Sequence, residues 1–241
     1  MYTDPNWEEK FKRIGAFWRH SGDPCRPYAL LTNSLITDSF FNADRVFSNP
    51  QVTEQAIGHL IHHPTYRHIL EATLMKQAPQ PVRGTTMSDP IPSYQENGPL
   101  RPTRIIGIAY GGIIPAYSAA HHAGAACGYA TKRPDDTLSL GRCEIAERDS
   151  IVIIEDTIST GGTVRKLRVA IEQGYPNTRI VKCVLTLCNR SGSTNFDDFE
   201  IVALFSPLYR TWKRGKNPFT KDGQEHVEPV HPKPHWDEFV N

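Results

Sequence analysis

The chain contains 241 residues, of which 39% are hydrophobic and 22% are charged, a composition typical of a globular protein that buries a core without disulfides. The 27 Lys and Arg residues nearly balance the 26 Asp and Glu residues, so the formal charge of +1 gives no reason to expect nucleic acid or an anionic membrane as a partner. Early acidic residues and the lack of a long apolar run argue against a secretory signal and a membrane-spanning helix. The five cysteines include no CxxC pair, which favours free thiols and a cytoplasmic location.

The N-terminal region, residues 1–78, is predicted to form a small unit of helices and short strands. Helical spacing of apolar residues covers 52–61 and 66–75, and Pro64 is suited to begin the second helix. The segment 29–41 is predicted to form two short extended pieces around a polar turn.

The pattern changes after residues 79–102, which contain six prolines and are predicted to be a linker or an insertion. Residues 103–212 are predicted to form an α/β core with strands at 104–109, 127–131, 151–155, 180–187 and 201–205, and helices at 113–122 and 163–173. Because these strands are apolar on both faces, they predict a mainly parallel sheet with flanking helices. Residues 213–241 are polar and lack periodicity, and are predicted to be a peripheral tail.

The most informative segment is 151–163, in which four apolar residues lead to Glu155 and Asp156 and a loop rich in glycine and hydroxyl groups then begins a helix. Loop glycines let backbone N–H groups approach a phosphate, and a helix N-terminus favours an anion. Carboxylates in the same place would repel the phosphate, but they suit the neighbouring ribose hydroxyl groups. The segment therefore predicts a ribose 5-phosphate site at the carboxyl end of a strand. The GxGxxG and GxxxxGK[ST] patterns of dinucleotide and P-loop sites are absent.

This segment resembles the phosphoribosyl-pyrophosphate (PRPP) motif of the type I phosphoribosyltransferases. Other segments are similar to the orotate branch of that family. The segment 107–115 resembles its pyrophosphate loop, 30–42 its N-terminal hood, 129–136 its mobile catalytic loop, and 187–192 the position of its Asp-Arg pair. The resemblance implies a type I phosphoribosyltransferase core with an N-terminal hood. It also implies a homodimer that transfers the ribose 5-phosphate of PRPP to a nucleobase. Orotate is the leading candidate for this base.

The resemblance also implies a role for individual residues. The catalytic residues would be Asp156, Glu155, Lys132 and Arg133. The 5′-phosphate of PRPP would bind at Thr157, Ser159, Thr160, Gly161, Gly162 and Thr163, the pyrophosphate at Tyr110, Gly111 and Gly112, and the base at Phe40, Phe41 and Arg190. The implied cofactor is Mg²⁺, held mainly through PRPP and water, with no protein ligand assigned.

The chain departs from the orotate pattern at cationic positions. Thr32 and Gly111 stand where that branch usually carries lysines, and the loop with Lys132 and Arg133 is shortened. Two alternatives therefore stay open beside an orotate enzyme. One is transfer to another base, and the other is a catalytically weak protein of the same fold that senses PRPP or a nucleotide.

Overall fold

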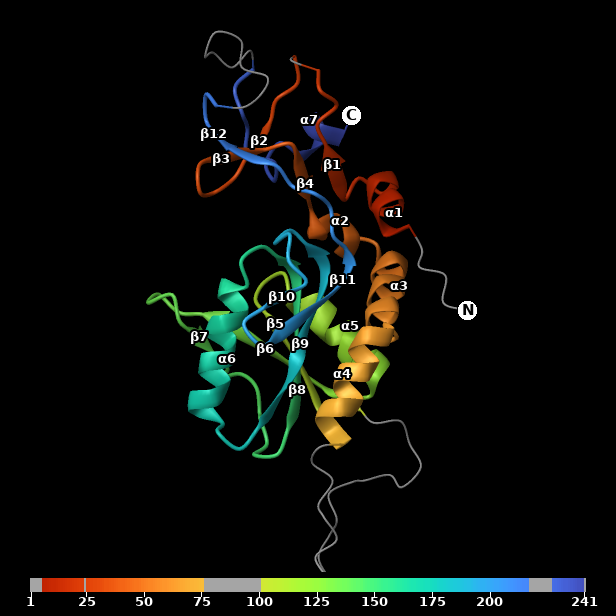
Figure 1. The fold of residues 1–241 in the computed structure, drawn as a ribbon, viewed down its shortest axis with the longest axis vertical. Coiled ribbons are helices and arrows are strands. Elements are labelled where there is room, and N and C mark those ends of the chain that lie inside the picture. Colours follow the sequence, from red (N-terminus) through yellow and green to blue (C-terminus); the bar gives the residue numbers. More distant parts are fainter. Residues whose placement is uncertain (1–5, 24, 76–100, 217–226, 241) are drawn as a thin grey trace, which may run out of the picture.

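The computed structural model describes residues 6–23, 25–75, 101–216 and 227–240, and it shows two parts placed one above the other (Figure 1). The larger part is built on a seven-stranded sheet, and the smaller part is a hood formed by both ends of the chain. The predicted linker at 79–102 lies outside the described residues, except for its last two positions. Among the described helices, none is long and apolar enough to cross a membrane.

The sheet of the larger part has the strand order β10-β11-β9-β8-β5-β6-β7. Its strands are β5 (Arg104–Ile108), β6 (Ala126–Lys132), β7 (Leu138–Ser139), β8 (Ser150–Ile158), β9 (Arg179–Asn189), β10 (Asn195–Phe196) and β11 (Phe199–Phe205). The five strands from β11 to β6 are parallel, and β10 and β7 pair antiparallel at the two edges. This arrangement confirms the predicted mainly parallel α/β sheet.

Helices cover both faces of the sheet. On one face lie α3 (Pro50–Ile61), α4 (Pro64–Met75) and α5 (Ile113–Ala123), and on the other lies α6 (Gly162–Gly174). Strand β8 shows the reason, because its apolar residues alternate between the two layers: Ile151 and Ile153 pack in the α6 layer, and Val152 and Ile154 in the opposite one.

The hood contains α1 (Trp7–Arg13), β1 (Phe17–Arg19), β2 (Ala29–Leu30), β3 (Leu35–Thr37), β4 (Ser39–Phe41), α2 (Ala43–Phe47), β12 (Thr211–Lys213) and α7 (Trp236–Val240). Strand β12 pairs with β3, and Val230 bridges to Ala29 of β2. The side chains of Trp236 and Phe239 are buried. Val230, Trp236 and Phe239 of the predicted peripheral tail are thus packed into the hood, which two aromatic residues in a polar sequence could not indicate.

Candidate functional site

Strand β8 extends to Ile158, past its predicted end at residue 155, so Asp156 lies within the strand together with Glu155. The strand continues because its pairing with β9 continues, from Glu155 opposite Thr186 to Ile158 opposite Asn189. The Thr186 hydroxyl also donates to the Asp156 carbonyl at 3.1 Å. The two carboxyl groups are therefore held on a regular strand at the carboxyl edge of the sheet, where ligands of parallel sheets bind.

A tight turn follows β8 and leads into α6. Gly161 has a φ of 71°, and a Cβ placed on it would lie 2.8 Å from the Phe196 ring, so this position requires glycine. The N-cap residue of α6 makes no side-chain hydrogen bond to the helix. Ser159, Thr160 and Thr163 are exposed. Three hydroxyl-bearing residues thus lie exposed at one helix N-terminus, where the Gly162 N–H donates to Oγ1 of Thr160 at 3.4 Å, and a helix N-terminus suits a phosphate. The structure has a short loop between β8 and α6 where the sequence predicted one, and it places Thr157 in the strand.

Arg165 braces this turn, a contact that the sequence did not indicate. Its Nη1 donates to the Thr160 carbonyl at 2.7 Å, and its Nε and Nη2 donate to the Asp197 carboxylate at 2.7 and 3.1 Å. The guanidinium also lies 5.2 Å from the centre of the Phe196 ring. Bidentate pairing between a guanidinium and a carboxylate fixes the relative position of the two groups, so Arg165 ties the turn to Asp197.

The two carboxyl groups differ from ordinary surface acids. Burial raises the pKa of Glu155 to about 9, and the neighbouring Asp156 adds to the shift. Oε2 of Glu155 is buried and has no hydrogen-bond partner among the described residues. Burial also raises the pKa of Asp156, against the N–H of Thr157, which donates to Oδ1 at 2.8 Å. A buried polar atom without a partner is uncommon in folded proteins, and here it lies where a ligand would approach.

The predicted pyrophosphate residues meet this acidic pair from the neighbouring strand. Residues 109–112 connect β5 to α5, and the Ala109–Tyr110 peptide bond is cis. A Cβ on Gly111 would lie 2.6 Å from Cγ of Asp156, and one on Gly112 would lie 2.3 Å from the Ile108 nitrogen. The backbone of this loop therefore packs directly against the Asp156 carboxyl. The same contact explains the missing lysine, because any side chain at Gly111 would displace Asp156.

The predicted cations of the mobile loop are engaged elsewhere. Lys132 Nζ lies 2.5 Å from Oδ1 of Asp136, and Asp136 also pairs with Lys166 of α6. Arg133 donates to the Ser139 hydroxyl at 3.3 Å, across the same hairpin. The structure does not bring either cation into contact with Glu155 or Asp156.

Of the predicted base contacts, Phe41 lies in the core. Its side chain is 4% exposed, and its ring centre lies 5.0 Å from that of Phe11 and 6.4 Å from that of Phe205. Phe40 points the other way along β4, is half-buried, and lies 5.8 Å from Trp236. Only Phe40 keeps a partly exposed ring, because successive residues of a strand face opposite sides.

Arg190 follows β9 at the same edge of the sheet as the acids. Its N–H donates to the Ile158 carbonyl at 2.7 Å, and its guanidinium lies 4.4 Å from the centre of the Tyr209 ring. The Nε atom is buried and makes no hydrogen bond within the described residues. Tyr209 also contacts Cys188 through its hydroxyl at 3.6 Å. Arg190 is thus stacked on Tyr209 with an unused donor, although no pattern in the sequence indicated this tyrosine.

The carboxyl groups of the site decide whether it could hold Mg²⁺. Within the described ranges no group of three or more His, Cys, Asp and Glu side chains lies close enough to hold a metal ion. Glu155 and Asp156 are two adjacent carboxyl groups, and Mg²⁺ is commonly bound by one or two carboxylates together with substrate phosphates and water. These residues therefore fit a metal that arrives with an anionic substrate.

Comparison with known proteins agrees with this geometry, although no family model matches the chain. An orotate phosphoribosyltransferase from Thermoanaerobacter sp. is 32% identical over 127 residues, which cover 52% of this chain and 64% of that relative. Orotate phosphoribosyltransferase 2 from Mesorhizobium japonicum is 24% identical over 195 residues, which cover 81% of this chain and 84% of that protein. The matches to the first relatives span less than two thirds of their length.

Solved structures of other proteins share the fold of this chain. Orotate phosphoribosyltransferase from Aeropyrum pernix aligns with a TM-score of 0.54 at 13% identity, over 83% of this chain and 93% of that chain. Adenine phosphoribosyltransferase from Leishmania tarentolae aligns with a TM-score of 0.51 at 12% identity, over 86% of this chain and 89% of that chain. The chain has the fold of type I phosphoribosyltransferases and is similar in sequence to the orotate branch, as the motif predicted.

Proposed function

We propose that this chain, with its phosphoribosyltransferase fold, transfers the ribose 5-phosphate of PRPP to a nucleobase and releases pyrophosphate. The position of Asp156 is the main observation in support of this proposal. Its carboxyl packs against Gly111 of one loop, and its own strand leads into the 159–163 turn at the start of α6. Two backbone loops therefore flank one acidic pair, an arrangement that would suit a ribose carrying phosphate at one end and pyrophosphate at the other.

Each part of the reaction has a group in this arrangement. The 5′-phosphate binds the N–H groups of the 159–163 turn, and the pyrophosphate binds those of the 109–112 loop. The bond between C1 of the ribose and the pyrophosphate oxygen breaks with its electron pair on oxygen. The base nitrogen bonds to C1 and releases its proton. Positive charge develops on the ribose as in glycoside cleavage, and the carboxyl group of Asp156 stabilises it, while Glu155 and Asp156 hold the ribose hydroxyl groups.

Cations complete the site in this proposal. Lys132 and Arg133 lie in the 132–138 hairpin, where the exposed pair between Lys132 and Asp136 contributes little to stability. Closure of the hairpin over bound PRPP would exchange that pair for contacts with the substrate and exclude water. Mg²⁺ would be held by the carboxyl groups and the substrate, and it would neutralise charge on the pyrophosphate.

Orotate is the base that we propose. Arg190 has a buried Nε without a partner, and a guanidinium suits an anionic carboxylate edge, which purines lack. Phe40, which is half-buried on β4, would cover one face of the base. A homodimer, formed through exposed Tyr110, Ile114 and Tyr117 around the start of α5, and a cytoplasmic location belong to the same proposal.

The test is a direct assay of purified protein with Mg²⁺, PRPP and a panel of bases that includes orotate and adenine. Mass spectrometry would identify the nucleotide, and a second assay would measure pyrophosphate. We expect orotidine monophosphate, and no product from the Asp156→Asn variant. If the product is a different nucleotide, the proposed reaction stands and the base is not orotate. Binding of PRPP without any product would favour the sensing protein, and a lack of PRPP binding would refute the proposal.

A further inference from the structure

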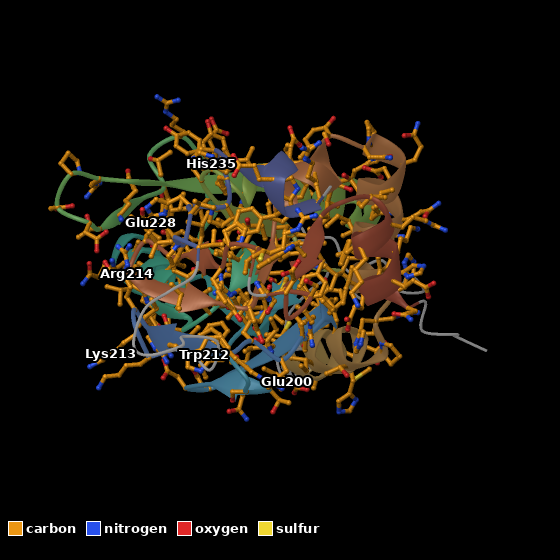
Figure 2. The ribbon with its side chains drawn as sticks, turned by 90° about the horizontal axis from the view of Figure 1, so that it is seen from above. Glu200, Trp212, Lys213, Arg214, Glu228 and His235 are labelled. Atoms are coloured by element: carbon orange, nitrogen blue, oxygen red, sulfur yellow. The ribbon has the colours of Figure 1, made fainter. Side chains whose placement is uncertain are left out.

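Tyr209 lies on the short connection that leads from β11 of the larger part to β12 of the hood. Figure 2 looks down onto the hood, and its labels on Glu200 of β11 and Trp212 of β12 mark the two strands that this connection joins. The Tyr209 ring centre lies 6.5 Å from that of Phe17 on β1, and the Tyr209 hydroxyl lies 3.6 Å from Sγ of Cys188 on β9. The ring is therefore held between a strand of the hood and a strand of the larger sheet.

The ring of Tyr209 supports Arg190, the residue that follows β9. The guanidinium carbon of Arg190 lies 4.4 Å from the ring centre. The Arg190 N–H donates at 2.7 Å to the carbonyl of Ile158, the last residue of β8, which fixes the Arg190 backbone at the carboxyl edge of the sheet. Tyr209 packs against the buried layer that contains α5, and Asp156 meets Gly111 just before α5. Arg190 and Asp156 therefore belong to the same face of the sheet, at the same edge.

The ring is the contact that keeps the Arg190 side chain in this position. Its Nε atom is buried without a hydrogen-bond partner, and no carboxylate pairs with its guanidinium among the residues that the structure describes. Burial of an unpaired donor costs free energy, and a long arginine side chain otherwise turns its charged end to water. A cation stacked on an aromatic ring away from water offsets that cost. The Nε–H is thus held in place and left free for a ligand, so that less ordering is needed on binding.

We propose that Tyr209 is a positioning residue, whose ring holds the Arg190 guanidinium with its Nε–H free to donate to an anionic edge of the base. This inference rests on the proposed function, in which Arg190 meets the carboxylate of orotate. It makes the connection between the larger part and the hood a determinant of base choice. The ring is the required group, since the Tyr209 hydroxyl contacts the Cys188 sulfur and not the arginine.

The kinetic experiment compares the unchanged protein with Tyr209→Leu, which removes the ring, and with Tyr209→Phe, which keeps it. We expect Tyr209→Leu to raise the KM for orotate about tenfold, because loss of a desolvated cation–ring contact releases the arginine. The KM for PRPP and kcat should change by less than about twofold, since Tyr209 belongs to neither loop of the PRPP site. Tyr209→Phe should restore the KM for orotate to within about twofold of the unchanged protein. Uracil is orotate without its carboxylate, so its inhibition constant against orotate should be the same in all three proteins.

A second measurement needs no substrate. The Arg190 Nε–H signal in a ¹H–¹⁵N spectrum can be assigned by its loss in the Arg190→Lys variant. The ring current of an aromatic face shifts a stacked N–H upfield, so this signal should lie upfield of the exposed arginines in the unchanged protein and in Tyr209→Phe. In Tyr209→Leu it should move to the position of the exposed arginines. A role of Tyr209 in stability alone would not produce this pattern.

Phe199→Leu is the matched control. Phe199 is a buried aromatic residue of β11 whose ring centre lies 5.8 Å from the Arg168 guanidinium, and it packs in the layer of α6 on the other face of the sheet. This variant should lose stability without a change in the KM for orotate or in the Arg190 signal. The inference is wrong if Tyr209→Leu leaves the KM for orotate or the Arg190 signal unchanged, or if Tyr209→Phe is as impaired as Tyr209→Leu. A protein that makes another nucleotide from PRPP overturns this inference and keeps the proposed reaction, whereas a protein that does not bind PRPP refutes the proposed function itself.

Discussion

Glu155 should make the free protein less stable as the pH rises through neutrality. Burial and the neighbouring Asp156 raise its pKa from 4.5 to about 9. Between these values the folded protein keeps a proton that the unfolded chain has lost, so the free energy of unfolding falls with pH by about 1.4 kcal/mol per unit. The loss from this group begins near pH 4.5 and is complete near pH 9. At pH 7 it amounts to about 3 kcal/mol.

The variant Glu155→Gln removes this dependence, because an amide copies the neutral carboxyl and does not titrate. We expect the variant and the unchanged protein to unfold alike near pH 4.5. At pH 7 the variant should be more stable by about 3 kcal/mol, or about 6 to 12 °C in Tm for a chain of this size. Asp156 also has a raised pKa, so the variant keeps the smaller pH dependence that comes from this neighbour.

The assay is urea unfolding at pH 5, 6, 7 and 8, followed by circular dichroism and analysed where the transition is two-state. Glu200→Gln is the matched control, because Glu200 is exposed on β11 of the same sheet, and its free energy of unfolding should follow that of the unchanged protein at every pH. The reasoning is refuted if Glu155→Gln keeps the full pH slope, since Glu155 would then be ionised in the folded state.

Three further predictions test the site by substitution. Asp156→Asn should keep the fold, seen by circular dichroism, and lower kcat/KM about 100- to 1,000-fold; near-normal turnover would contradict its role. Gly111→Ala should displace the Asp156 carboxyl, since the new Cβ would lie 2.6 Å from Cγ, and steady-state kinetics should show a loss of about 10- to 100-fold. Arg165→Ala should raise the KM for PRPP about tenfold with little change in kcat, because the brace on the Thr160 carbonyl is lost. Arg168→Ala, which removes ion pairs one turn further along α6, should leave that KM unchanged.

Local patterns in the sequence predicted the parallel sheet and both loops of the site, because these features depend on neighbouring residues. Apolar runs define the buried strands, and a glycine pair before a helix predicts a backbone that approaches an anion. The end of β8 was predicted wrongly for the same reason. Two acids after an apolar run indicate an exposed end, whereas pairing of Thr157 with Cys188 and of Ile158 with Asn189 extends the strand. Such pairing depends on residues about 30 positions away.

The position of the C-terminal segment depends even more on distant contacts. Lys233 reaches Asp44, which is 189 positions away in the sequence, and its turn is placed by a bond from Trp236 to Gly15 at a separation of 221. No periodicity in residues 213–241 carries this information. In the same way, the sequence around Lys132 did not indicate that Asp136 would also pair with Lys166, 30 positions away.

The protonation of Glu155 bears on how the site tolerates so few cations. With a pKa of about 9, its carboxyl is neutral at pH 7, so the free site holds one negative charge fewer than its two acids suggest. A neutral carboxyl neither repels a pyrophosphate nor needs a lysine to balance it, and it can donate a hydrogen bond to a ribose hydroxyl or a phosphate oxygen. Burial of Glu155 therefore lowers the negative charge that PRPP would meet, at a site that carries Thr32 and Gly111 where the orotate pattern would place lysines.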